Sequence, residues 1–267
     1  MSIITLLSDF GVDDEYVGVM KGVILSICPT VAIVDITHQI DPQDVAQAAH
    51  LIPATYRFYP QGTVHLIVVD PGVGSQRDII ALDHAGHVFI APDNGVLTLL
   101  MNREKSDTIV RIHNADYFLK PVSATFHGRD IFAPVGAHIA KGVGLEDLGT
   151  RTDAGNIAHL EDLNCRLSEN GELVGKIISI DRFGNLITNI DSDSLARLRQ
   201  NGAENRLQIR FNSHVIFDLA DTYTRAEPGL PLALIGSRNY LEIAVNCGSA
   251  KQHFKAQKGD AVRVKKL

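Results

Sequence analysis

The sequence predicts an α/β protein whose N-terminal half is built on a mainly parallel sheet and whose second half is all-β. Up to about Gly149, apolar runs typical of buried strands alternate with stretches of helical spacing. A polar stretch, 150–164, interrupts this alternation and predicts a linker. Beyond it, short strand candidates follow one another closely, which is typical of a small barrel or sandwich.

The first half opens with an apolar run, 3–7, that predicts a buried strand. A helix is expected next, because apolar residues between 17 and 27 recur at helical spacing. Asp13 is its expected N-cap, and Pro29 lies just past its end.

A second helix is expected to open at Asp41, with Pro42 at its first position and Asp44 two residues later. Pro53 should bend or end that helix, because proline lacks the N–H that the helix needs. Further buried strands are expected at 31–36, 64–69 and 88–91.

The second half contains many short strand candidates, as expected for one small all-β domain, with one short helix at 192–200. Asn170-Gly171 marks a hairpin turn, because both residue types accept positive φ. The expected strands are 173–180, 186–190, 207–211, 215–219, 232–235, 240–245 and 261–264.

Composition excludes several classes of protein. The 267 residues are 45% hydrophobic and 21% charged, which suits a globular protein with a substantial core. A net charge of −6 without a basic run argues against nucleic acid, and no apolar stretch is long enough to cross a membrane. The chain enters a strand at once, so no signal peptide is expected. Cys28, Cys165 and Cys247 follow no paired pattern and predict free thiols in a reducing compartment, the cytoplasm.

The segment 69–77 carries the strongest sign of chemistry. Asp70 follows a buried strand, a glycine-rich turn comes next, and Arg77 stands seven residues after the aspartate. Open α/β sheets place their reaction centres just beyond the carboxyl ends of their strands. The alternative is an aspartate that merely caps a tight turn.

Polar groups also follow the other expected strands of the first half. They gather at one edge of a parallel sheet, where a binding crevice forms. These groups are Asp9 with Asp13 and Asp14, His38, Asp93 with Asn94, and His127 with Asp130.

The second half has polar clusters at 181–185, 237–240 and 246–249. Carboxylate, amide and aromatic groups of this kind can hold the hydroxyls, base edge and base face of a nucleoside. Gly184-Asn185 is equally typical of a plain hairpin turn.

Taken together, these motifs resemble the S-adenosylmethionine hydroxide adenosyltransferase family, relatives of the bacterial fluorinase and chlorinase. The resemblance implies an N-terminal α/β domain over 1–155 and a smaller C-terminal β-barrel domain over 165–267. It also implies a homotrimer with active sites between subunits, no cofactor and no metal. The implied reaction converts S-adenosyl-L-methionine and water to adenosine and L-methionine. The matching motifs are 5–11, 69–74, 92–95, 125–130, 181–185 with 188–190, and 237–249.

The resemblance assigns catalysis to Asp70, Arg77 and His127. The sulfonium of the substrate is already a good leaving group, so the difficulty lies in water, whose pKa is about 15.7. A cation beside the water favours hydroxide, and an imidazole or carboxylate can accept the proton. Arg77 is expected to supply the charge, whereas Asp70 and His127 orient and deprotonate the water. Which of these two takes the proton stays open.

The residue pair His127-Gly128 separates the chain from halogenating relatives. The fluorinase carries Tyr-Ser there, and its serine helps to hold the halide. Gly128 has no hydroxyl, and a halide needs no base, whereas water does. The pair therefore predicts the water-using branch of the family.

Substrate contacts carry over by position. Asp9 matches a carboxylate that binds the ribose hydroxyls, with Asp14 near it. The chain departs from the fluorinase at Ile187, where that enzyme stacks a tryptophan, and at Val245, where it has an arginine. In the second half, Asp181, Ser237 and Arg238 match the methionine part, Asn185 the ribose or sulfonium side, and Phe183, Asn246 and Cys247 the adenine pocket.

Two other classes of function stay open. A divalent-metal phosphohydrolase would gather carboxylates and histidines around one ion. A non-catalytic module would bind adenosine or S-adenosylmethionine without changing it. The side chains available to a metal would be Asp9, Asp13, Asp14, His38, Asp70, His127 and Asp130.

Overall fold

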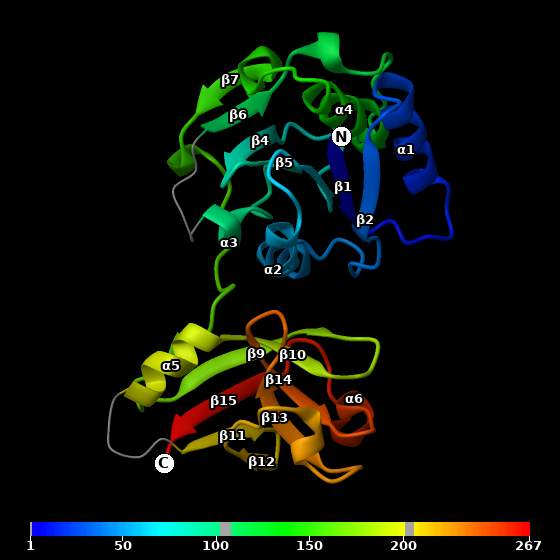
Figure 1. The fold of residues 1–267 in the computed structure, drawn as a ribbon. Helices are drawn as coiled ribbons and strands as arrows, with labels where there is room; N and C mark the ends of the chain where they lie inside the picture. Colours follow the sequence, from blue (N-terminus) through cyan, green and yellow to red (C-terminus); the bar gives the residue numbers. More distant parts are fainter. Residues whose placement is uncertain (1, 102–107, 201–205) are drawn as a thin grey trace. The chain divides into compact units, whose positions relative to one another are not determined.

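The computed structural model describes residues 2–101, 108–200 and 206–267. The chain divides into two compact units, Met1–Glu161 and Asp162–Leu267, and each is built on a sheet of its own (Figure 1). Within these described ranges, no helix has the length and apolar character needed to cross a bilayer.

The first unit contains a seven-stranded sheet in the order β2-β1-β3-β5-β4-β6-β7. The pairs β2–β1, β1–β3 and β3–β5 are parallel, whereas the pairs β5–β4, β4–β6 and β6–β7 are antiparallel. All of these strands except β4 and β7 therefore run in one direction, and the predicted α/β class is confirmed. The strands are β1 (Ile3–Ser8), β2 (Ala32–Thr37), β3 (Val64–Val68), β4 (Ile79–His84), β5 (His87–Pro92), β6 (Thr108–Ile112) and β7 (Gly149–Thr152).

Helices cover both faces of this sheet. Leu6 of β1 packs in a cluster with Met20 and Ile24 of α1 and with Val135 of α4. The next residue, Leu7, packs on the opposite face in a cluster that includes α2 and α3, because successive side chains of a strand alternate. The helices are α1 (Tyr16–Ile27), α2 (Val45–Thr55), α3 (Thr98–Met101) and α4 (Ala133–Ala140), and a π-helical turn η3 (Gly128–Phe132) leads into α4.

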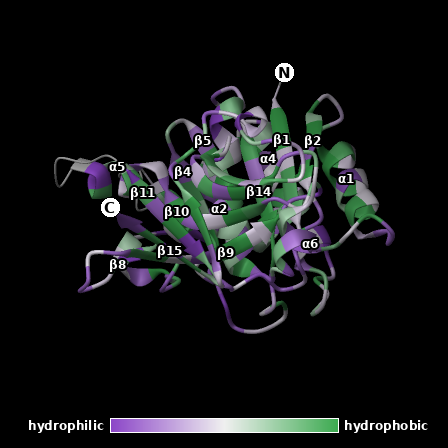
Figure 2. Ribbon diagram, turned by 90° about the horizontal axis from the view of Figure 1, so that it is seen from below, coloured by the Kyte–Doolittle hydropathy of each residue, from purple (hydrophilic) through white to green (hydrophobic). Residues whose placement is uncertain are grey.

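Burial on both faces explains why the parallel strands are nearly continuous apolar runs. In Figure 2 the hydrophobic colour covers much of β1 and α1. Short 3-10 turns complete the unit at η1 (Tyr56–Phe58), η2 (Ala115–Tyr117), η4 (Leu145–Leu148) and η5 (Ala154–Asn156).

Both predicted helix caps of the first unit are wrong. Helix α1 begins at Tyr16 after Glu15, so Asp13 lies before the helix. Helix α2 is capped by Asp44, whose Oδ1 accepts the N–H of Gln47 at 2.8 Å, and not by Asp41. The reason is local, because Gln43 adopts a φ of +66° and turns the chain before the helix can start.

Pro53 lies inside α2, which continues to Thr55 instead of ending at the proline. Strand β7 occupies 149–152 and so overlaps the stretch predicted as a linker. Strands β4 and β6 are further elements that the sequence reading did not identify. The β4–β5 hairpin turns at Ala85 and Gly86, both with positive φ, where alanine gives little sign of a turn.

The second unit contains an eight-stranded antiparallel sheet in the order β12-β11-β15-β9-β10-β14-β13, with β8 paired to β9. The end strands β12 and β13 contact each other, so the sheet is nearly closed and the predicted barrel is confirmed. Gly171, with a φ of +74°, turns the β8–β9 hairpin as expected. The strands are β8 (Arg166–Leu167), β9 (Leu173–Ile180), β10 (Leu186–Asp191), β11 (Leu207–Phe211), β12 (His214–Phe217), β13 (Pro231–Ile235), β14 (Tyr240–Val245) and β15 (Ala261–Lys266).

The barrel interior is filled by apolar side chains that alternate along the strands. On β14, Leu241, Ile243 and Val245 belong to this interior cluster. The intervening Tyr240 and Glu242 therefore point to the outer face of the sheet. Helices α5 (Ser192–Gln200) and α6 (Ala250–Phe254) and the 3-10 turn η6 (Tyr223–Arg225) lie between strands.

Candidate active site

The segment after β3 is a tight, internally bonded turn. The carbonyl of Asp70 accepts the N–H of Val73 at 3.2 Å, and the Ser75 hydroxyl donates to the Gly72 carbonyl at 2.7 Å. The amide of Asn94 donates to the carbonyl of Val69 at 2.9 Å and ties the turn to the end of β5. The turn thereby brings the side chain of Arg77 back to the end of β3.

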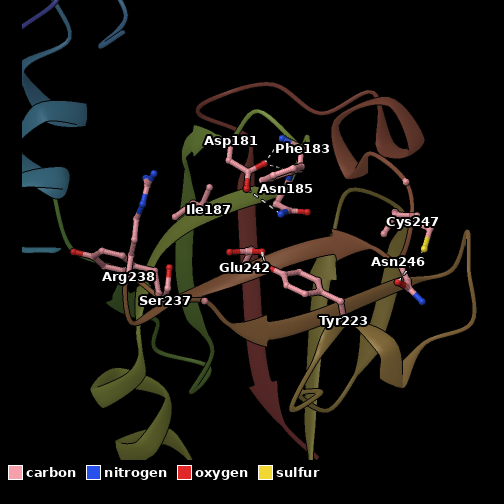
Figure 3. Close-up of a pocket in the computed structure, with 14 residues that line it drawn as sticks. Asp181, Phe183, Asn185, Ile187, Tyr223, Ser237, Arg238, Glu242, Asn246 and Cys247 are labelled. Carbon is pink, nitrogen blue, oxygen red and sulfur yellow. Dashed lines mark hydrogen bonds between the residues drawn. The ribbon is translucent and has the colours of Figure 1, made fainter. Parts of the chain in front are cut away.

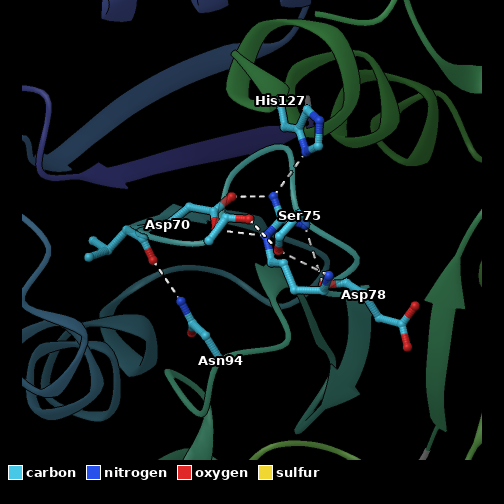
Figure 4. A network of polar contacts seen from close by, with 8 residues as sticks. Asp70, Ser75, Asp78, Asn94 and His127 are labelled. Carbon is cyan, nitrogen blue, oxygen red and sulfur yellow. Dashed lines mark hydrogen bonds and ion pairs between the residues drawn. The ribbon is translucent and has the colours of Figure 1, made fainter. Parts of the chain in front are cut away.

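Arg77 binds Asp70 and His127 at the same time (Figure 4). Its Nε donates to Asp70 Oδ1 at 2.6 Å, and its Nη2 bonds Asp70 Oδ2. The same Nη2 lies 3.0 Å from Nδ1 of His127. The side chains of Asp70 and Arg77 are only 5% and 10% exposed, so this ion pair is largely shielded from water.

The contact with Arg77 determines which nitrogen of His127 carries the proton. A guanidinium can only donate, so Nδ1 must accept and the neutral ring carries its proton on Nε2. Burial and the nearby charge of Arg77 lower the pKa of His127, although Asp70 and Asp130 act in the opposite direction. At neutral pH the ring is therefore uncharged.

The loop that carries His127 is held by an ion pair between the buried carboxylate of Asp130 and the partly exposed guanidinium of Arg129. Asp130 is fully buried, and its two oxygens accept from Arg129 at 2.6 and 2.9 Å. Its Oδ2 also accepts the N–H of Ser123 at 2.7 Å. Gly74 meets this loop closely, because a Cβ at Gly74 would collide with the carbonyl oxygen of Ala124.

Asp9 emerges at the same sheet edge as Asp70. Ser8 pairs with Val68 in the parallel β1–β3 ladder, so both strands end side by side. Oδ2 of Asp9 accepts the N–H of Gln43 at 2.8 Å, which links the end of β1 to the segment before α2. Asp14 is exposed, two residues before α1.

Several of the side chains that the sequence offered as metal ligands are instead bound to other protein groups. Asp70 and Asp130 each bind a guanidinium of their own, and His38 contacts the Ser8 hydroxyl at 2.7 Å. Within the ranges that the structure describes, no group of three or more His, Cys, Asp or Glu side chains is arranged to hold a metal ion.

The second unit carries a pocket of about 640 Å³ on the outer face of its sheet (Figure 3). All of the residues that the sequence proposed for substrate in this unit line it, together with both positions that depart from the fluorinase. The lining residues are Asp181, Phe183, Asn185, Ile187, Tyr223, Gly236, Ser237, Arg238, Tyr240, Glu242, Val245, Asn246, Cys247 and Gly248.

The β9–β10 connection is both a hairpin turn and a wall of this pocket. Asp181 Oδ1 accepts the N–H groups of Phe183 and Asn185, each at 2.9 Å, and Oδ2 accepts the amide of Asn185 at 2.9 Å. Gly184 adopts a φ of +86°. The ring of Phe183 is 77% exposed and is available to a flat ligand.

Tyr223 and Glu242 are lining residues that the sequence reading missed. Glu242 is only 7% exposed, and it accepts the hydroxyl of Tyr223 at 2.6 Å. The signal in the sequence was a charged residue within an apolar strand, 240–245, because a buried carboxylate costs free energy unless a polar partner compensates it.

The family assignment rests on the whole chain. The N-terminal domain of the SAM hydroxide adenosyltransferases matches residues 4–149, and their C-terminal domain matches residues 175–263. A protein of Thermus thermophilus named (R)-S-adenosyl-L-methionine hydrolase is 36% identical over 97% of each chain. A fluorinase of Nocardia brasiliensis is 31% identical, covering 98% of this chain and 96% of that protein.

A solved structure agrees with these sequence matches. The crystal structure of an uncharacterized conserved protein from Thermotoga maritima superposes with a TM-score of 0.89 at 36% identity, covering 98% of this chain and 100% of that one. The chain belongs to the SAM hydroxide adenosyltransferase family.

Proposed function

We propose that this protein hydrolyses S-adenosyl-L-methionine to adenosine and L-methionine. The observation that carries the proposal is the shielded network of Asp70, Arg77 and His127 in a chain of this family. Relatives from Thermus thermophilus and Salinispora arenicola, 36% and 32% identical, are named (R)-S-adenosyl-L-methionine hydrolases.

The reaction is a displacement at the 5′ carbon of the ribose. The water oxygen forms a bond to C5′, the C5′–S bond breaks, and its electron pair returns to sulfur. The sulfonium thereby becomes the neutral thioether of methionine, and the water proton passes to a base. Arg77 would stabilise the developing hydroxide by its charge.

We assign the orientation and deprotonation of the water to Asp70 and His127 together. The carboxylate of Asp70 keeps lone pairs beyond the two bonds from Arg77. The Nδ1 of His127 accepts from Arg77, so this nitrogen could take a proton only if that contact gives way. Its Nε2–H is free in this tautomer to donate to the water oxygen.

The pair His127-Gly128 supports water instead of a halide as the nucleophile. A Cβ at Gly128 would lie 3.1 Å from both Met20 Sδ and Phe126 Cε2. A serine at this position would therefore press on these two side chains and require them to shift by a few tenths of an ångström.

Substrate recognition is proposed to use both units. Asp9 and Asp14 would serve the ribose from the first unit. Asp181, Ser237 and Arg238 would hold the methionine part, Asn185 the ribose or sulfonium side, and Phe183, Asn246 and Cys247 the adenine. One substrate needs groups from both units, so the two sets must meet either within a chain or between neighbouring subunits. On the resemblance to the family, we infer neighbouring subunits of a homotrimer whose active sites lie between them.

We place the protein in the cytoplasm, since Cys28, Cys165 and Cys247 are all free thiols. No nucleic acid partner, cofactor or metal enters the proposal.

Chromatography of S-adenosyl-L-methionine after incubation with the pure protein in ¹⁸O-water tests the function. Adenosine labelled at its 5′-hydroxyl and unlabelled methionine are expected, with or without a chelator. Both sulfonium epimers should be assayed, because the relatives' name specifies (R). Intact substrate would indicate a binding module, loss of activity with chelator would indicate a metal enzyme, and a 5′-halogenated product in chloride or fluoride would indicate a halogenase.

A further inference from the structure

The pocket of the second unit has two ends that lie at the two ends of β14. Ser237 and Arg238 precede the strand, and Asn246 and Cys247 follow it. Glu242 lies between these pairs, on the middle of the strand (Figure 3). Its neighbours Leu241 and Ile243 fill the barrel core, so the carboxylate faces the pocket.

The carboxylate of Glu242 is held in place from both sides. Tyr223 donates its hydroxyl to Oε1 at 2.6 Å. Oε2 lies against Gly236, where any Cβ would collide with it. Glycine at 236 therefore keeps open the space that this oxygen occupies.

The charges that line the pocket do not balance without a ligand. Asp181 and Glu242 are carboxylates, and Arg238 supplies a single guanidinium. Arg238 donates to the hydroxyl of Ser179 at 3.3 Å, whereas the hydrogen bond to Glu242 comes from Tyr223. Burial raises the pKa of Glu242 and Asp181 acts in the same direction, whereas the hydrogen bond from Tyr223 and the charge of Arg238 lower it. A cation in the pocket would further favour the ionised carboxylate.

S-Adenosyl-L-methionine carries the complementary set of charges. Its amino acid part has one ammonium and one carboxylate, and its sulfonium adds one positive charge. Arg238 and Asp181 suffice for the amino acid part, which the proposed function places at their end of the pocket. The sulfonium stands between methionine and adenosine in the substrate, as Glu242 stands between the two ends of the pocket.

We propose that Glu242, held by Tyr223, is a specificity-determining residue that selects the sulfonium substrate over neutral thioethers. This inference rests on the proposed function. When the C5′–S bond breaks, sulfur loses its charge, so the attraction to Glu242 is strongest in the bound substrate. Glu242 should therefore lower KM without raising kcat, and it should not retain the neutral thioether product.

The test compares ligands that differ in one charge. KM and kcat for S-adenosyl-L-methionine, and inhibition constants for S-adenosyl-L-homocysteine and adenosine, are measured for wild type, Glu242→Gln and Tyr223→Phe. S-Adenosyl-L-homocysteine keeps the ammonium and the carboxylate of the substrate, but its sulfur is a neutral thioether. Glu169→Gln, which removes an exposed carboxylate of the same unit outside the pocket, is the matched control.

Glu242→Gln should raise KM about 10- to 100-fold, because it removes an opposite charge from a shielded site, with kcat unchanged or higher. The inhibition constant of S-adenosyl-L-homocysteine should change less than about threefold, which is the scale of a lost neutral contact. Tyr223→Phe should shift KM in the same direction by a smaller factor. Glu169→Gln should behave as wild type.

Equal weakening of the sulfonium and thioether ligands in Glu242→Gln and Tyr223→Phe would overturn the proposal, as would a fall in kcat at unchanged KM. Failure of the proposed function gives a different result. If the wild-type protein leaves S-adenosyl-L-methionine intact, calorimetric dissociation constants replace KM, and the loss of discrimination between the two ligands still decides the role of Glu242.

Discussion

At the scale of single residues, Arg77 determines the state of its two partners. It neutralises the buried carboxylate of Asp70 and occupies Nδ1 of His127. An arginine suits this arrangement because its planar fork directs several N–H donors at once, whereas a lysine offers a single compact ammonium.

We expect His127→Ala and Asp70→Ala to lower kcat by about 10²- to 10⁴-fold, the range for loss of a positioned acid–base group. Arg77→Lys should restore little of the activity lost in Arg77→Ala, because lysine cannot bind Asp70 and His127 together. Initial rates at saturating substrate provide the measurement, and circular dichroism controls for folding. Near-normal turnover in His127→Ala would remove this residue from the mechanism.

At the scale of elements, the site depends on the contact between two loops. The turn 69–77 follows β3, and the segment 123–127 precedes η3. Gly74, with a φ of +77°, lets the first loop approach the carbonyl of Ala124 in the second. This contact holds Asp70 and Arg77 within reach of His127.

Gly74→Ala should therefore reduce both activity and stability, because the added methyl group forces the loops apart and strains the backbone. Gly62→Ala is a matched control, since Gly62 has a φ of +82° but nothing within 4 Å of its Cβ position. Both variants should lose about 1 kcal/mol of unfolding free energy from positive φ. A kcat that falls equally in both variants would contradict a specific role for the loop contact.

The sequence predicted elements well where one local pattern decided the outcome. The parallel strands were evident from apolar runs, and the β-strands of the second unit from alternation and turns. The cap of α2 and the strand β4 were missed, because a left-handed Gln43 and an Ala-Gly turn carry no clear local signal. Glu242 was missed because its function depends on which face of β14 is outermost, which only the closed sheet reveals.

At the scale of the whole molecule, buried histidines link stability to pH. His65 of β3 and His87 of β5 lie beside each other on neighbouring strands, with Nε2 of His65 3.2 Å from Nδ1 of His87. Burial, and then His87, lowers the pKa of His65 from 6.5 to about 3. The folded protein therefore resists protonation at a site that the unfolded chain protonates near pH 6.5.

The free energy of unfolding should be highest above pH 6.5 and fall as the pH drops toward 3, because the unfolded chain binds the extra proton in that window. His65 alone contributes a slope of up to about 1.4 kcal/mol per pH unit. Urea denaturation between pH 4 and 8 should show a shallower dependence in His65→Gln than in wild type. The exposed His159→Gln serves as control, and an equal slope in all three proteins would refute this assignment.

Assembly can be tested with two inactive variants. If sites lie between subunits of a ring, mixing Asp70→Ala with Asp181→Ala after partial denaturation and reassembly should restore part of the activity. Each mixed trimer then contains one site with both native halves. Mass spectrometry verifies the mixed rings, and mixed rings without activity would show that each site lies within one chain.

The double contact of Arg77 also has a thermodynamic consequence. Asp70, Arg77 and His127 form one coupled unit, since removal of any member leaves the other two mispositioned or a charge uncompensated. The losses in free energy of unfolding caused by the single substitutions should then not add. In a double-mutant cycle measured by denaturation, Asp70→Ala combined with His127→Ala should destabilise the protein little more than the more damaging single change, with an interaction energy of about 1–3 kcal/mol.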